Sequence, residues 1–189
     1  MTKIAIVFHS GYGHTKKAAE SVQKGAASIG AAVDLIAIDA EGNIPDAGWE
    51  TLKAADGIIF GSPTYMGTVS WQFKKFADAS SKPWYTMDWK GKVAAGFTNS
   101  ATLNGDKFST IAYLATLAAQ HKMLWTGTGM HPSNAKASTR DDLNNLGGYL
   151  GLLVTSPSDA SVDEMIPGDL KTAEAFGKNV AEVVKSVKG

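Results

Sequence analysis

The chain has 189 residues, of which 44% are hydrophobic and 19% are charged, with 18 basic and 18 acidic side chains. This composition is typical of a globular domain rather than a disordered chain, and the zero formal charge gives no general attraction to nucleic acid or to an anionic membrane. The absence of cysteine excludes disulfides, thiolate metal ligands and a cysteine nucleophile, and with no leader or membrane-spanning apolar run we expect a single cytoplasmic domain over residues 1–189.

Apolar, β-branched runs alternate with stretches of helical spacing along the chain. Strands are predicted at residues 3–8, 32–38, 57–61, 92–97 and 123–125. Apolar residues three and four apart predict helices around residues 15–29, 69–77, 111–118 and 173–187. Residues 127–161 are rich in Gly, Ser, Thr, Asn and Pro, so we expect an ordered insertion there, a candidate oligomer contact, with a short helix near 141–153. The pattern predicts an α/β fold, a doubly wound five-stranded parallel sheet with helices on both faces.

In such a sheet, ligands bind beyond the carboxyl ends of the strands. Three predicted loops at that edge, residues 10–15, 62–67 and 98–105, combine small and polar residues with glycine. The first loop joins a buried strand to a helix, so backbone N–H groups, two hydroxyls and the helix dipole are available to one anion. It lacks the Lys-Ser/Thr of a Walker A loop, and Lys16 stands where a dinucleotide-binding loop needs its third glycine. The pattern favours a statically bound monophosphate, with simple helix capping by Ser10 and Thr15 as the alternative.

Four motifs occur in a characteristic order along nearly the whole chain. They are Ser10-Gly11-Tyr12-Gly13-His14-Thr15, Pro63-Thr64-Tyr65-Met66-Gly67, Trp84 ahead of Trp89-Lys90-Gly91-Lys92, and Leu146-Gly147-Gly148-Tyr149-Leu150-Gly151. In this combination the chain resembles the flavodoxin-like NAD(P)H:quinone oxidoreductases of the tryptophan-repressor-binding-protein type. The resemblance implies FMN as cofactor, NAD(P)H as co-substrate, and a homo-oligomer, dimer or tetramer, in which neighbouring subunits complete each site.

The resemblance also implies site residues. The FMN phosphate would bind the first loop, and the flavin ring would lie against residues 63–66 and 98–104. The implied cofactor-binding residues are Ser10, Gly11, Tyr12, Gly13, His14, Thr15, Pro63, Thr64, Tyr65, Met66, Asn99, Ser100, Ala101, Thr102, Leu103 and Asn104. Tyr12 and Trp84 are the implied substrate-binding residues. The family's flavin-facing histidine is replaced by Gln120 in this chain.

The function that this resemblance implies is transfer of two electrons from NAD(P)H, by way of FMN, to a quinone or to free flavin. We assign no catalytic residue and no metal ligand; His121 and His131 are candidate proton donors. Two alternatives stay open: a flavodoxin-type carrier of electrons between proteins, and a flavin-free regulatory or scaffold protein on the same fold. The neutral charge favours the enzyme, because electron-carrying flavodoxins are typically strongly acidic.

Overall fold

The first strand, β1 (Lys3–His9), lies inside the sheet because the next two strands pair with both of its edges. In this computed structural model, which describes residues 1–189, β2 (Ala32–Ile38) pairs with one edge and β3 (Gly57–Tyr65) with the other. β5 (Val93–Ser100) extends the sheet beyond β3, and all of these pairings are parallel. Residues 4–9 of β1 are buried on both faces, as expected of a central strand in a parallel sheet.

The fifth position of the sheet is occupied by two separate segments. β6 (Leu124–Trp125) pairs with the beginning of β5, and β7 (Leu152–Thr155) pairs with its end. Residues 126–151 leave the sheet between these two segments and form turns and irregular structure. The predicted five parallel positions are therefore confirmed, but the short helix predicted near 141–153 is wrong. Leu152 and Val154 alternate into the core with the period of a strand, and no helical turn forms before them.

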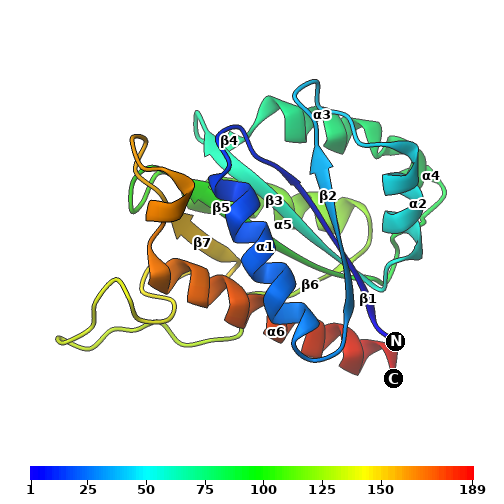
Figure 1. Cartoon of the computed structure of the whole chain (residues 1–189). Helices are drawn as coiled ribbons and strands as arrows, with labels where there is room; N and C mark the ends of the chain where they lie inside the picture. Colours follow the sequence, from blue (N-terminus) through cyan, green and yellow to red (C-terminus); the bar gives the residue numbers. More distant parts are fainter.

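Helices cover both faces of the sheet, as predicted (Figure 1). α1 (His14–Ala27) and α6 (Pro167–Lys188) pack on one face, where Val22 and Phe176 are fully buried. α2 (Asp46–Ala54), α3 (Trp71–Ala79) and α5 (Lys107–Gln120) pack on the other face, around Phe73 and Leu114. The remaining elements are short: β4 (Thr68–Val69), α4 (Ser81–Tyr85) and the 3-10 turn η1 (Val162–Glu164). None of the helices has the length and apolar character needed to cross a membrane.

The connections place two groups of segments at opposite edges of the sheet. The loops that follow β1, β3, β5 and β7 all leave from the carboxyl edge, because these strands are parallel. α4 lies beyond the other edge, near α2 and on the right of Figure 1, whereas the start of α1 and the segment after β7 lie on the left. Residues of α4 are therefore far from the carboxyl-edge loops within one chain.

Candidate functional site

The loop between β1 and α1 is organised by a single hydroxyl. Ser10 Oγ accepts hydrogen bonds from the backbone N–H of Gly13 and of Lys16, both at 3.1 Å, so Ser10 does cap the helix. Gly13 has φ of +93°, a left-handed conformation that glycine adopts without strain. The N–H groups of Gly11, Tyr12, His14 and Thr15 have no partner within the chain. The loop thus leaves four donors free at the positive end of a 14-residue helix.

Thr15 adds a fifth free group to this loop. Thr15 as a whole is only 2% exposed and lines a cavity at the carboxyl edge, where its hydroxyl oxygen keeps some accessible surface and forms no hydrogen bond within the chain. A hydroxyl in this position takes its hydrogen-bond partner from a ligand or from water in the cavity. Capping therefore explains Ser10 but not Thr15. The hydroxyl of Thr15 and the free amides are arranged to serve an acceptor from outside the chain.

The cavity at this edge has a volume of about 360 Å³ and is built from four loops. Its lining residues are Tyr12, His14, Thr15, Pro63, Thr64, Tyr65, Asn99, Ser100, Ala101, Ser156, Pro157 and Ser158. Nine of these were candidate residues from the three predicted loops, which the structure brings together. The last three follow β7 and were missed. Their signal was present, because an apolar run followed by Ser156-Pro157 repeats the pattern of Ser62-Pro63 after the apolar run at residues 57–61.

Hydrogen bonds between neighbouring strands fix the walls of this cavity. Asn99, at the end of β5, exchanges two hydrogen bonds with Ser156 Oγ, at 2.8 and 3.1 Å. The Thr64 hydroxyl lies 2.8 Å from the hydroxyls of both Thr98 and Thr110, so its side chain points into the fold and not into the cavity. These buried contacts tie β3, β5, β7 and α5 together. The walls are therefore formed before any ligand binds.

Two tyrosines lie beside the opening. A Cβ placed on Gly11 would come within 2.6 Å of Tyr65 Oη, so the ring of Tyr65 reaches back over the first loop and would have to move if residue 11 carried a side chain. Burial, together with the nearby Tyr12, raises the pKa of the Tyr65 hydroxyl, which stays protonated at neutral pH. Tyr12 itself is 81% exposed. The ring of His14 is engaged elsewhere, since its Nε2 lies 2.9 Å from the carbonyl oxygen of Ala160.

Several candidate residues lie outside this cavity. Met66 and Gly67 have φ of +47° and +84° and form the tight turn between β3 and β4, with the Met66 side chain fully exposed at the tip. Thr102, Leu103 and Asn104 are exposed in the loop after β5. Trp84 lies in α4 at the opposite edge, where the ammonium of Lys122 is 5.2 Å from its ring. Within one chain, Trp84 does not reach the cavity.

The histidine assignments also need correction. His121 follows the last residue of α5 at the edge opposite the cavity, is buried, and packs against Trp89 with ring centroids 4.1 Å apart and the rings tilted by 33°. Its Nε2 lies 2.9 Å from Ser80 Oγ, and burial lowers its pKa to about 4, so it is a neutral core residue and not a proton donor. Gln120 precedes it at the same edge, and His131 lies in the insertion, so neither touches the cavity.

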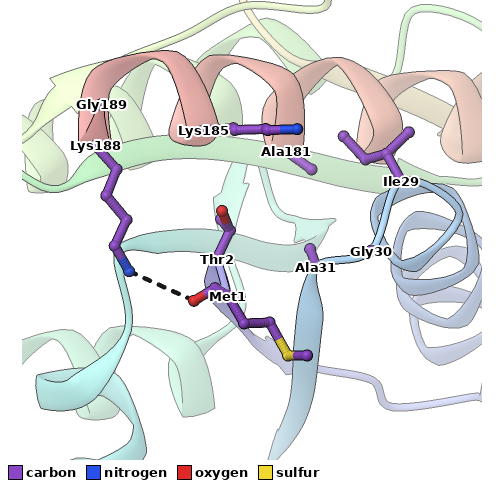
Figure 2. A pocket seen from close by; sticks show the side chains of 9 residues that line it. All are labelled: Met1, Thr2, Ile29, Gly30, Ala31, Ala181, Lys185, Lys188 and Gly189. Atoms are coloured by element: carbon purple, nitrogen blue, oxygen red, sulfur yellow. Dashed lines mark hydrogen bonds between the residues drawn. The ribbon is translucent and has the colours of Figure 1, made fainter.

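A second cavity of similar size, about 350 Å³, lies where the two ends of the chain meet (Figure 2). It is lined by Met1, Thr2, Ile29, Gly30, Ala31, Ala181, Lys185, Lys188 and Gly189. Lys188 is already occupied, since its ammonium lies 2.7 Å from the carboxylate of Asp56 and 3.4 Å from the carbonyl oxygen of Met1. Unlike the carboxyl-edge cavity, it is not formed by the loops that follow the parallel strands.

Comparison with known proteins agrees with this geometry. Residues 3–148 match the family of NADPH-dependent FMN reductases. A Pseudomonas aeruginosa protein named Flavodoxin FldP is 50% identical over 183 residues, 97% of each chain. An NAD(P)H dehydrogenase (quinone) of Archaeoglobus fulgidus is 31% identical over 206 residues, covering 99% of this chain and 100% of the relative. The crystal structure of a flavodoxin, WrbA-like protein from Agrobacterium tumefaciens is 47% identical and superposes with a TM-score of 0.81, covering 98% and 99% of the two chains, which confirms the flavodoxin-like fold.

Proposed function

The chain belongs to the NADPH-dependent FMN reductase family, a flavin oxidoreductase family, and on this premise we propose that it carries out an FMN-dependent transfer of two electrons from NAD(P)H to a quinone or to free flavin. FMN is the cofactor that the family and the flavodoxin-like relatives share. When bound, FMN supplies a redox centre that exchanges hydride with a nicotinamide. The residues of this chain would bind FMN, orient its flavin ring and leave the ring accessible to the nicotinamide and the acceptor.

The free donors of the first loop fit the phosphate of FMN. Four amide N–H groups and the Thr15 hydroxyl are unpaired, and no lysine or arginine lines the cavity. A hydrogen bond to a charged group contributes about 1.5–3 kcal/mol, so several of them can hold a phosphate dianion without a salt bridge. Gly11, Tyr12, His14 and Thr15 would therefore hold the phosphate. Ser10 would keep the loop in shape.

The enzymatic proposal rests on one observation: exposed aromatic side chains lie at the open side of the cavity. Pro63, Asn99 and Ser100 form walls that hydrogen bonds and strand pairing hold in place, which suits a planar ring that must not shift. Tyr12 stands 81% exposed beside the same cavity, and Tyr65 is 37% exposed. Aromatic side chains at an open rim suit a second planar molecule, whether nicotinamide or quinone, because offset stacking adds about 0.5–1.5 kcal/mol beyond area burial.

The test is an anaerobic reduction of the FMN-loaded protein. We expect NADH or NADPH to bleach the visible flavin absorbance, and benzoquinone added afterwards to restore it. The Tyr12→Ala variant should retain FMN but lose most of its quinone turnover, because Tyr12 is exposed beside the cavity and forms none of the hydrogen bonds that fix its walls. A flavin that neither nucleotide reduces would refute the proposal.

An electron carrier is the second candidate, and one observation favours it. The relative from Pseudomonas aeruginosa that is 50% identical bears the name flavodoxin. Against it stands the neutral charge of this chain, with 18 basic and 18 acidic residues, because a carrier docks on basic partners through acidic surface. The reduction experiment separates the two, since a carrier would accept single electrons from a reductase protein and not react directly with nicotinamide.

We also propose that the protein is a homo-oligomer whose sites are completed by neighbouring subunits. Trp84 and Lys122 lie together at the edge opposite the cavity, and Trp84 is 44% exposed, so a second copy could present this edge to the cavity. Sedimentation velocity of the FMN-loaded protein should give a dimer or tetramer. The Trp84→Ala variant should bind FMN with unchanged stoichiometry but reduce quinones more slowly; a monomeric wild-type protein would refute this part of the proposal.

A further inference from the structure

Lys107, the first residue of α5, is a buried lysine that the proposed reaction does not use. Its side chain is 1% exposed, and its ammonium donates to the backbone carbonyls of Thr102 and Leu103, the latter at 3.2 Å. Both carbonyls belong to the loop after β5. A lysine loses hydration when it is buried, which costs free energy unless hydrogen bonds such as these two replace the lost water contacts.

The loop between Ala101 and Gly105 has hardly any other support. None of its backbone N–H groups donates a hydrogen bond within the chain. Its carbonyls accept two bonds from the Lys107 ammonium and one, at 3.1 Å, from the Lys107 backbone N–H; the remaining contact is a long one of 3.5 Å from Ser100 Oγ. Gly105 and Asp106 follow with φ of +49° and +50°, a pair of left-handed residues that turns the chain sharply into α5. Lys107 is therefore the main tether of this loop.

Beneath the loop, Lys107 faces an ion pair. Asp169 of α6 accepts two 2.8 Å hydrogen bonds from Arg140 in the insertion, and one of 2.8 Å from the N–H of Thr155. The Asp169 carboxylate favours the charged form of Lys107 and the Arg140 guanidinium opposes it. Burial outweighs both and lowers the pKa of Lys107 to about 8. Asp169 is already paired with Arg140, so removing the Lys107 charge leaves no unpaired ion behind.

From this geometry we propose that Lys107 is a positioning residue of the flavin site: its ammonium fixes the 101–105 loop, whose first residue lines the cavity, and FMN is bound tightly only while that ammonium is protonated. The inference rests on the proposed FMN site, because Ala101, which begins this loop, and Ser100, the last residue of β5, line the cavity. The charge acts on the loop and not on the sheet. Losing it should weaken cofactor binding and leave the fold in place.

The experiment measures FMN binding to the apoprotein by quenching of flavin fluorescence, in the wild type and in Lys107→Met. For the wild type we expect the dissociation constant to rise about tenfold between about pH 7 and about pH 9.5, as Lys107 loses its proton. Lys107→Met should bind about tenfold more weakly at neutral pH and show no further loss at alkaline pH. The phosphate is already a dianion across this range, so its own titration does not produce the change.

Lys92→Met is the matched control. Lys92 is half-buried and also donates to two backbone carbonyls, those of Leu52 and Lys53, but at the amino edge of the sheet. This variant should bind FMN as the wild type does and keep its pH profile. Hydrogen exchange of the apoprotein gives an independent readout. The backbone amides at positions 107 and 109, which donate to the carbonyls of Asn104 and Asp106, should exchange faster in Lys107→Met, with those of β1 and β3 unchanged.

The outcomes separate this inference from the proposed function. A wild-type protein that binds no FMN at any pH overturns the proposed function and the inference with it. A wild type that binds FMN with the same affinity at both pH values, or a Lys107→Met variant with the wild-type affinity and profile, overturns the inference alone. Equal loss of affinity in Lys107→Met and Lys92→Met also overturns it, since the effect would then not depend on the loop.

Discussion

Replacing Thr15 by valine tests the phosphate site most directly, because it exchanges an unpartnered hydroxyl for a methyl group of the same size. The Thr15 hydroxyl has no partner within the chain and is accessible from the cavity, so the stability of the apoprotein should stay within about 1 kcal/mol of the wild type. FMN affinity should fall by about 1.5–3 kcal/mol, which is roughly 10- to 150-fold, because one charge-assisted hydrogen bond to the phosphate is lost. Titration calorimetry of the apoprotein measures the affinity, and urea unfolding measures the stability.

Thr172→Val should give the opposite result and is the matched control. The Thr172 hydroxyl donates to the carbonyl of Gly168 at 2.6 Å and accepts from the N–H of Asn144 at 2.8 Å, on the face of the sheet covered by α6. Its loss should lower the free energy of unfolding by about 1–3 kcal/mol and leave FMN affinity unchanged. If Thr15→Val bound FMN as tightly as the wild type, or destabilised the apoprotein as Thr172→Val does, the hydroxyl would be structural and the assignment of the phosphate site would fail.

Three further changes have defined outcomes. Gly13→Val should release FMN and destabilise the apoprotein by about 1–2 kcal/mol or more. A residue with a side chain disfavours φ of +93°, and the added Cβ would lie 2.8 Å from Val162 Cγ1. A variant that retains its full yellow colour on gel filtration would contradict this. The free energy of unfolding should fall by up to about 3 kcal/mol as the pH drops from about 6.5 toward about 4. The pKa of buried His121 is lowered to about 4, so over this range His121 takes up a proton in the unfolded chain but not in the folded one. His121→Gln should flatten this pH dependence in urea unfolding. Arg140→Met should cost about 3 kcal/mol in the same assay by leaving the buried carboxylate of Asp169 without its bidentate partner, and a loss under about 1 kcal/mol would mean that the pair contributes little.

Periodicity and turn chemistry predicted most of the sheet. The strand at residues 32–38 has the predicted bounds, and β1 runs one residue further than predicted, to His9. β3 and β5 continue to Tyr65 and Ser100, well beyond their apolar runs. Their last residues are polar, but backbone pairing with β4 and β7 keeps them extended. Hydrophobicity reports burial and not backbone pairing, so these ends could not be located from the sequence pattern.

The site was predictable where a loop follows directly from a strand. Tyr12, Pro63 and Asn99 line the cavity because parallel strands end together. Ser156 was missed because the run before it was assigned to a helix, although its Ser-Pro pattern was visible. Met66 shows the limit of a motif, since the motif identifies a residue but not the direction of its side chain. The φ of +47° at the hairpin tip turns Met66 outward.

The divided fifth strand implies that the size of this domain can be changed without redesigning its sheet. β6 ends opposite Ala94 and β7 begins opposite Phe97, so a bridge of two residues would join them into one continuous strand and make residues 126–151 dispensable to the pairing. The Arg140–Asp169 ion pair stands against such a deletion. Removing residues 126–151 would remove Arg140 and leave the buried carboxylate of Asp169 without its partner. A shortened chain should therefore fold only if Asp169 is neutralised in the same step.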